Sequence, residues 1–306
     1  MATANEPKPE GIAAFLNPEE IHKLDRIVLL SRYVVEGNLA GAHRSPLKGA
    51  SSEFADHKMY GIGDDPKRID WKVLSRTDRY FVKRYEDETN LRVYIALDRS
   101  KSMAYGSGAV TKYEFACRLA AALAYVVIKA RDSVGLFLFS EKIDVEMEPR
   151  NSLNHLNNLL KRLQNEPPAS TTRVADALHQ IAGSIRKRAL IVVISDLLDN
   201  EKDINLALAH FRKRLHDVIV FHVLDPMEID LSFKKGFEFE DLETNERITA
   251  DPRALMTEYQ KVFGEFLEQY RMACDGMKVD YRLARTDQPS EEYVRAYLDE
   301  RRRLSK

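Results

Sequence analysis

Hydrophobic residues recur in two alternating patterns from residue 91 onward. Apolar runs predict strands at 91–98, 133–140, 189–195, 217–224 and 278–284. The run at 189–194 contains no polar residue, which is typical of a parallel strand covered on both faces. Between the runs, apolar residues three and four positions apart predict helices at 111–130, 151–164, 173–187, 203–214, 252–274 and 290–304. Two short stretches, near 143–148 and 237–249, favour hairpin or edge strands.

This alternation predicts an α/β fold with a doubly wound, mostly parallel sheet of the Rossmann type. In such sheets, ligands bind beyond the carboxyl ends of the strands, at the point where the strand order reverses. The predicted strands are followed there by polar residues, namely Asp98, Ser140, Asp196 and Asp225. These four positions are therefore the first candidates for function.

The segment before residue 91 has a different character. Residues 1–15 are predicted to be a disordered tail. Asn17-Pro18 then has the pattern of a helix start, with an N-cap residue followed by proline, and the helix fades near Gly37. Residues 41–54 are rich in Gly, Ser, His and Pro and predict a loop, whereas the alternation at 80–85 favours a half-exposed strand.

The domain organisation follows from this division of the chain. We predict a tail at 1–15, an N-terminal helix and β-containing extension at 16–90, and the sheet domain with its C-terminal helices at 91–306. The extension is expected to pack on the sheet. Trp71 is its predicted packing anchor, and the charged residues around it favour a salt-bridge network over a partner-binding surface.

Composition narrows the classes of function. The 306 residues are 44% hydrophobic and 31% charged with a formal net charge of −1, which gives no reason to expect nucleic acid or a membrane surface as partner. The longest apolar run has ten residues, at 119–128, and is too short to cross a bilayer. The N-terminus lacks the apolar core of a signal peptide, so we expect a cytoplasmic protein. Cys117 and Cys274 lie in helical patterns and are expected to be buried thiols.

The stretch Asp98-Arg99-Ser100-Lys101-Ser102 carries the clearest chemistry. In an extended loop leaving a strand, alternate side chains point the same way, so the oxygens of Asp98, Ser100 and Ser102 face one point. Arg99 and Lys101 then face away, and we expect them to be solvated. Three hard oxygen donors suit Mg²⁺, which prefers octahedral oxygen coordination and retains water ligands. Further ligands have to come from other strand ends.

Two later loops offer such ligands. Thr171 and Thr172 precede a predicted helix, and Asp196 ends the strand at 189–195. The combined set contains hydroxyls and two carboxylates but no His or Cys, so it favours Mg²⁺ or Mn²⁺ over Zn²⁺. Each residue alone is more often a strand end, a turn former or an N-cap than a ligand. Their joint occurrence on the expected elements favours a metal-capable site.

The three loops together resemble the von Willebrand factor A family. Its metal-ion-dependent adhesion site has a D-x-S-x-S loop, a Thr from a second loop and an Asp from a third. Asp98, Ser100 and Ser102 match the first loop, and Asp196 matches the third. Counting back from Ala177-Leu178 selects Thr172 in the second, although Thr171 stands where glycine is common in the family, so the choice between the two threonines stays open.

The residues before the sheet resemble a bacterial family known as domain of unknown function 58. The resemblance rests on the stretches at 61–78 and 81–88, followed by the adhesion-site strand. It implies a partner, a MoxR-type AAA+ ATPase, and a role in chaperone-like assembly or maturation of other proteins. It also implies binding without catalysis. Ser100, Ser102 and Thr172 would contact the ion, Asp98 and Asp196 would hold it mainly through water, and a partner protein would offer a carboxylate to it.

Two other functions compete with this interpretation. A magnesium-dependent phosphohydrolase of the haloacid dehalogenase type would carry a second Asp where Ser100 stands, and the sequence contains no G-x-x-x-x-G-K-[ST] phosphate loop. An inert scaffold with a vestigial site is the third alternative.

Overall fold

The computed structural model describes residues 11–38, 52–61, 69–87, 91–168, 173–230, 237–240, 247–250, 252–295 and 298. The chain divides into two compact units, of which the first comprises Met1–Ala40 with Leu91–Ser305 and the second comprises Gly41–Asn90 with Lys306. The segment 16–90, predicted to be one extension, is thus divided between the two units at residues 40 and 41.

A six-stranded sheet forms the centre of the first unit. Its strands are β3 (Arg92–Asp98), β4 (Ser133–Phe139), β5 (Ile143–Arg150), β6 (Leu190–Ser195), β7 (Asp217–Leu224) and β10 (Asp280–Arg285). They lie in the order β10-β7-β6-β3-β4-β5, and every neighbouring pair is parallel except β4 and β5. The predicted α/β fold with a mostly parallel sheet is confirmed, and β5 is the edge strand expected near 143–148.

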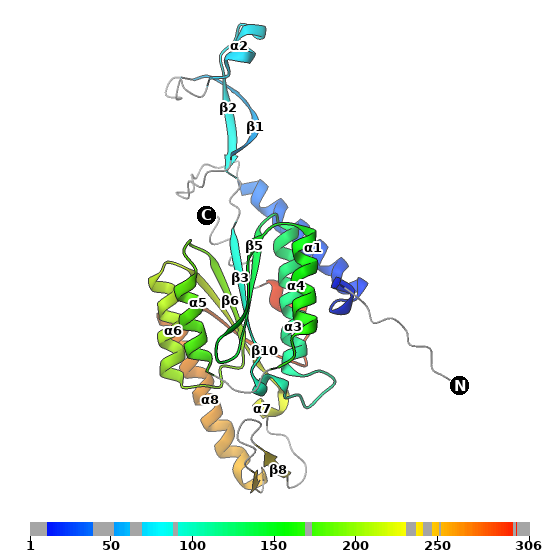
Figure 1. The fold of residues 1–306 in the computed structure, drawn as a ribbon, viewed down its shortest axis with the longest axis vertical. Helices are drawn as coiled ribbons and strands as arrows, with labels where there is room; N and C mark the ends of the chain where they lie inside the picture. The colour runs from blue at the N-terminus through cyan, green and yellow to red at the C-terminus, as the bar shows by residue number, and fades with distance from the viewer. Residues whose placement is uncertain are drawn as a thin grey trace, which may run out of the picture. The chain divides into compact units, whose positions relative to one another are not determined.

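Helices cover both faces of this sheet (Figure 1). On one face lie α1 (Pro18–Asn38), α3 (Lys112–Lys129) and α4 (Leu153–Asn165), and on the other α5 (Val174–Ser184), α6 (Glu201–Lys213) and α8 (Pro252–Gly276). The strands supply both cores because successive side chains point to opposite faces. In β3, Val93 and Ile95 join the first core, whereas Tyr94 and Ala96 join the second.

The strand order reverses beside β3. The chain passes from β3 to β4 and β5 on one side and then returns to place β6 on the other side of β3. Asp98 is the last residue of β3, and Asp196 directly follows β6. They therefore lie at the switch point where ligands bind in doubly wound sheets.

The N-terminal segment departs from the prediction of a tail at 1–15. Residues 1–10 lie outside the described residues, but Gly11–Ala14 form the 3-10 helix η1, and Leu16 is buried in the first core. The reason is that Ile12, Phe15 and Leu16 give this short stretch enough apolar surface to pack against the sheet domain. The helix α1 begins as predicted, with Asn17 and Glu20 each accepting a hydrogen bond from the other's backbone N–H.

The second unit contains a hairpin and a short helix. Strands β1 (Ser52–Met59) and β2 (Phe81–Asp87) pair antiparallel, and α2 (Trp71–Thr77) lies between them in the chain. Asp70 caps α2 through the backbone N–H groups of Lys72 and Val73. The prediction of Trp71 as a packing anchor is wrong, because its side chain is 63% exposed. The predicted loop at 41–54 lies partly outside the described residues, and β1 occupies its end.

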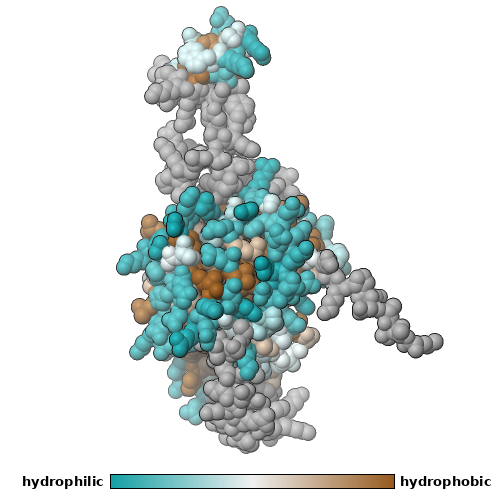
Figure 2. Space-filling model, in the orientation of Figure 1, coloured by the Kyte–Doolittle hydropathy of each residue, from teal (hydrophilic) through white to brown (hydrophobic). Residues whose placement is uncertain are grey.

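The remaining elements lie beyond β7. A short helix, α7 (Pro226–Asp230), precedes the two-stranded antiparallel pair β8 (Phe237–Glu240) and β9 (Arg247–Ala250), which matches the hairpin expected at 237–249. Residues 290–295 are helical at the start of the last predicted helix. Among the helices within these described ranges, none has the length and hydrophobicity that a bilayer-spanning segment needs. The face drawn in Figure 2 is mostly hydrophilic, with a hydrophobic patch near its centre.

Candidate functional site

Asp98 ties together two loops at the switch point. Its side chain is completely buried, and its Oδ1 accepts a hydrogen bond of 2.8 Å from the backbone N–H of Ser100. Its Oδ2 accepts a 2.6 Å hydrogen bond from the Ser195 hydroxyl, which comes from the last position of β6. The Ser195 hydroxyl in turn accepts from the backbone N–H of Leu197. Asp98 therefore fixes the loop after β3 against the loop after β6.

Ser100 and Ser102 turn their hydroxyls toward each other. The two Oγ atoms are 2.9 Å apart, and Ser100 is fully buried. The backbone holds this geometry because η3 (Lys101–Ala104) begins directly after Ser100, and the buried Met103 anchors it to the first core. Two oxygens at this separation fit a hydrogen bond. They also fit one edge of an Mg²⁺ octahedron, whose neighbouring oxygens are about 2.9–3.0 Å apart when each lies ~2.1 Å from the ion.

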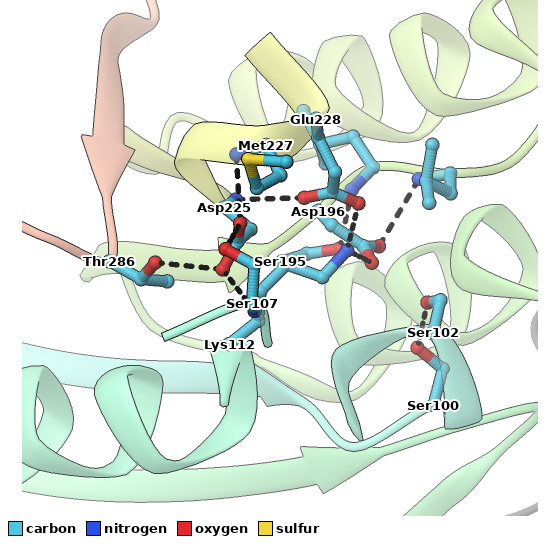
Figure 3. Close-up of polar contacts among 12 residues, drawn as sticks. Ser100, Ser102, Ser107, Lys112, Ser195, Asp196, Asp225, Met227, Glu228 and Thr286 are labelled. Carbon is cyan, nitrogen blue, oxygen red and sulfur yellow. Dashed lines mark hydrogen bonds and ion pairs between the residues drawn. The ribbon is translucent and has the colours of Figure 1, made fainter. Parts of the chain in front are cut away.

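A buried lysine lies beside the second carboxylate. Lys112, at the first position of α3, places its ammonium 2.7 Å from Asp196 Oδ2 and 2.7 Å from Glu228 Oε1 (Figure 3). The lysine and Asp196 side chains are 1% and 0% exposed, whereas that of Glu228 is 20% exposed. The same Glu228 accepts a hydrogen bond from the backbone N–H of Asp225 through its other oxygen. Lys112 thus joins the end of β6 to α7.

The network continues across the carboxyl edge of the sheet. Asp225, at the end of β7, accepts hydrogen bonds from the backbone N–H of Ser107 at 2.9 Å and of Met227 at 2.8 Å. It also accepts from the hydroxyls of Ser107 and Thr286, the latter directly after β10. Figure 3 shows these groups converging on Asp225 from three segments. Every lone pair of this carboxylate that faces the protein is used, so Asp225 holds loops together.

Burial shapes the electrostatics of the edge. Burial, together with the neighbouring charge of Asp196, raises the pKa of Asp98 to about 7. Burial opposes the charge of Lys112, but the carboxylates of Asp196 and Glu228 outweigh it and raise the pKa of the ammonium. His222 lies beneath the site and hydrogen-bonds the backbone carbonyl of Asp196 and the Tyr281 hydroxyl. Burial lowers its pKa to about 4, so it is neutral.

The structure brings together four of the five sequence-predicted ligands. Asp98 is the last residue of β3, Ser100 and Ser102 lie in the loop after it, and Asp196 directly follows β6. The fifth, Thr172, and its alternative Thr171 lie outside the described residues. Within the described part of the chain, no group of three or more His, Cys, Asp or Glu side chains is arranged to hold a metal.

Arg99 differs from the expectation that it is solvated. Its side chain is only 12% exposed, its Nε donates a 3.0 Å hydrogen bond to the carbonyl of Pro167, and its Nη1 lies 3.3 Å from Asp144. The physical reason is the edge strand β5, which places Asp144 beside the loop, with the segment after α4 supplying the carbonyl. Arg99 consequently ties the loop after β3 to β5 and to the segment after α4.

Sequence reasoning missed Lys112 and Glu228. The Thr111–Glu114 capping box at the start of α3 is present as predicted, but a capping box indicates only a helix start. It does not indicate a role for Lys112, which lies between its two residues. One signal was available. A lysine in the first turn of a helix opposes the helix dipole, so it needs acidic partners. Which acids these are depends on non-local pairing of β6 with β7, and the local pattern does not contain that information.

Comparisons with known proteins place this chain in a family. Residues 56–265 match the sequence profile of the family described as "Protein of unknown function DUF58". The chain belongs to the DUF58 family. The matched range runs from the second half of β1 to the first half of α8 and includes Asp98, Ser100, Ser102, Lys112, Asp196 and Glu228.

DUF58 relatives and similar structures extend the comparison. The uncharacterized proteins Rv1480 of Mycobacterium tuberculosis and Mb1516 of Mycobacterium bovis are each 25% identical over 218 residues, which cover 70% of this chain and 68% of theirs. A solved structure of BatB from Bacteroides thetaiotaomicron is 20% identical with a TM-score of 0.47 and covers 70% of this chain and 98% of its own. An aerotolerance-related membrane protein from Bacteroides fragilis is 20% identical with a TM-score of 0.49, and covers 70% and 99%.

Proposed function

We propose that this DUF58 protein is a non-enzymatic, metal-dependent protein-binding module that uses Mg²⁺ or Mn²⁺. The observation that carries the proposal is the pair of hydroxyls of Ser100 and Ser102, 2.9 Å apart, beside the buried carboxylates of Asp98 and Asp196 at the switch point of the sheet. Hard, uncharged and anionic oxygens at this spacing suit a small divalent cation.

The donor set fits the adhesion site of von Willebrand factor A domains. Ser100 and Ser102 would be direct ligands, with Thr172 proposed as the third. The carboxylates of Asp98 and Asp196 are already engaged by Ser195 and Lys112, so they would act on the ion mainly through water. Bound there, the ion would supply an electrophilic position that accepts a carboxylate oxygen from a partner.

The surroundings favour binding over turnover. The Ser195 hydroxyl is buried, donates to Asp98 and accepts from Leu197, so it holds the loop and is not exposed as a nucleophile. Leu198, whose backbone N–H donates to Asp196 Oδ1, is 44% exposed. An exposed apolar side chain two residues from Asp196 suits a protein partner better than a small polar substrate.

We propose a MoxR-type AAA+ ATPase as the partner, in chaperone-like assembly or maturation of other proteins. The support is family membership together with the resemblance of the site to a protein-binding one. The ATPase would offer an Asp or Glu side chain to the ion.

The test is a pull-down from the source cell with Mg²⁺ or with EDTA. Wild type is compared with Asp98→Ala, Ser100→Ala and the control Asp275→Asn, which changes an exposed carboxylate on α8. We expect partners that require both Mg²⁺ and the intact loop, with the control behaving as wild type. Equal recovery of every partner with and without Mg²⁺ from all four proteins would contradict the proposal.

A further inference from the structure

The Lys112 side chain is the one buried cation that directly contacts a proposed ligand of the ion, among the described residues. Its ammonium touches two carboxylates at 2.7 Å and lies 5.9 Å from the centre of the Tyr105 ring. Burying an ammonium is unfavourable unless its charge is balanced, and here Asp196 and Glu228 balance it. A neutral apolar residue would fill the same space without this cost, so the charge itself calls for an explanation.

The position of the ammonium gives that explanation. It binds Asp196 Oδ2, and Asp196 Oδ1 accepts a longer hydrogen bond of 3.3 Å from the backbone N–H of Leu198. The ammonium therefore neutralises part of the negative charge of Asp196, which is one of the proposed ligands of the ion. A divalent cation at the proposed site is repelled by the ammonium in a region of low dielectric, where such repulsion is strong.

We propose that Lys112 is an internal counter-ion that sets the affinity of the site, by weakening divalent-ion binding and leaving room for a partner's negative charge. This inference rests on the proposed function and deepens it. Ion and partner would then bind cooperatively, because the carboxylate of the partner replaces the negative charge of Asp196 that Lys112 neutralises.

The net charge of Lys112, Asp196 and Glu228 predicts an order of ion affinities among variants. Asp196 and Glu228 carry two negative charges and Lys112 one positive charge, so the triad carries −1 in the wild type. The triad carries −2 in Lys112→Met, 0 in Glu228→Gln and −1 in the double variant. Ion affinity should therefore rise in the first, fall in the second and return toward the wild-type value in the third.

The experiment measures Mn²⁺ binding to the full chain by electron paramagnetic resonance of the free ion, with Mg²⁺ competition. We expect Lys112→Met to lower the dissociation constant about tenfold and Glu228→Gln to raise it about threefold, with the double variant within about threefold of wild type. Lys112→Met leaves the carboxylates of Asp196 and Glu228 without their ammonium partner, so its fold is checked by circular dichroism in EDTA. The Glu228→Gln variant keeps the Lys112–Asp196 pair and tests the same order if Lys112→Met does not fold.

The outcomes separate the two proposals. Two results would assign Lys112 a purely structural role and overturn this inference alone. One is equal Mn²⁺ affinity of wild type and Lys112→Met. The other is an Mn²⁺ affinity below that of wild type in both Lys112→Met and the double variant. Tighter binding by Glu228→Gln would overturn it as well. Binding by Lys112→Met but not by wild type would support the counter-ion and remove the metal from the proposed function. Absence of binding in all four proteins would overturn both.

Discussion

At the scale of single residues, the proposed metal site would rely on two hydroxyls, whereas many metal sites rely on carboxylates. Asp98 and Asp196 are buried and already engaged, by Ser195 and by Lys112. Their part is to hold the loops and to set the local charge, while Ser100 and Ser102 face the space in front of the strands. This division keeps the affinity of the site for an ion sensitive to every charge nearby.

The Asp98→Asn variant tests how the charge of Asp98 affects the free energy of unfolding. The native pKa of Asp98 is about 7, above its ordinary value of 3.8, because burial and Asp196 disfavour the charge. The native protein therefore holds the proton more tightly than the unfolded chain, and its free energy of unfolding falls as pH rises from about 4 to about 7. The neutral amide removes this loss. We expect Asp98→Asn in EDTA to be at least as stable as wild type near neutral pH.

Urea unfolding over a pH series checks this, because the difference between the two proteins should shrink as the pH falls toward 4. A variant less stable by about 2 kcal/mol at every pH would show that the carboxylate acts only through its two hydrogen bonds.

At the scale of elements, the edge pair β4–β5 depends on a glycine. A Cβ on Gly135 would lie 2.5 Å from the carbonyl oxygen of Met147 and 3.0 Å from the nitrogen of Pro149, both on the backbone of β5. Because neither atom can turn away, Gly135→Ala should lower the free energy of unfolding by about 1–3 kcal/mol.

Gly183→Ala is the matched control, since a Cβ there meets nothing within 4 Å and the residue lies in α5. It should raise stability by about 0.5–1 kcal/mol. Chemical denaturation measures both variants. Changes of the same sign in the free energy of unfolding of the two variants would contradict the close approach of β5 to Gly135.

The elements that local patterns define were predictable from the sequence. The apolar runs predict β3, β4, β6, β7 and β10, and helical periodicity predicts α3 to α6 and α8, because both depend on neighbours in the chain. The strand β1 was not predicted, since His57 and Lys58 interrupt its apolar character and its pairing with β2 is non-local. The burial of Arg99 and of Lys112 depends on partners more than forty residues away, which no local pattern reveals.

At the scale of the whole first unit, two helix layers seal the sheet and both cysteines. Cys117 lies in the first core and Cys274 in the second, as free thiols, which confirms the expectation of buried thiols. Burial raises the pKa of each thiol to about 12. Only the thiolate reacts with disulfide reagents, so both cysteines should resist them in the native protein.

Labelling with a thiol reagent measures this. We expect slow labelling of the native protein, at a rate that follows local or global opening, and rapid reaction of two thiols in denaturant, with glutathione as the control for the reagent. Rapid labelling with an unchanged circular dichroism spectrum would show that a helix layer opens without unfolding.

The proposed binding of a divalent ion is tested most directly by the thermal unfolding of the full chain during a titration with Mg²⁺. A ligand that binds only the native state at ten times its dissociation constant adds about 1.4 kcal/mol of stability, which for a chain of this size is a rise in Tm of roughly 2 °C. We predict this rise for wild type and its loss in Ser100→Ala, whose Tm in EDTA should stay close to that of wild type. An equal response of both proteins to Mg²⁺, or none in wild type, would contradict the metal centre.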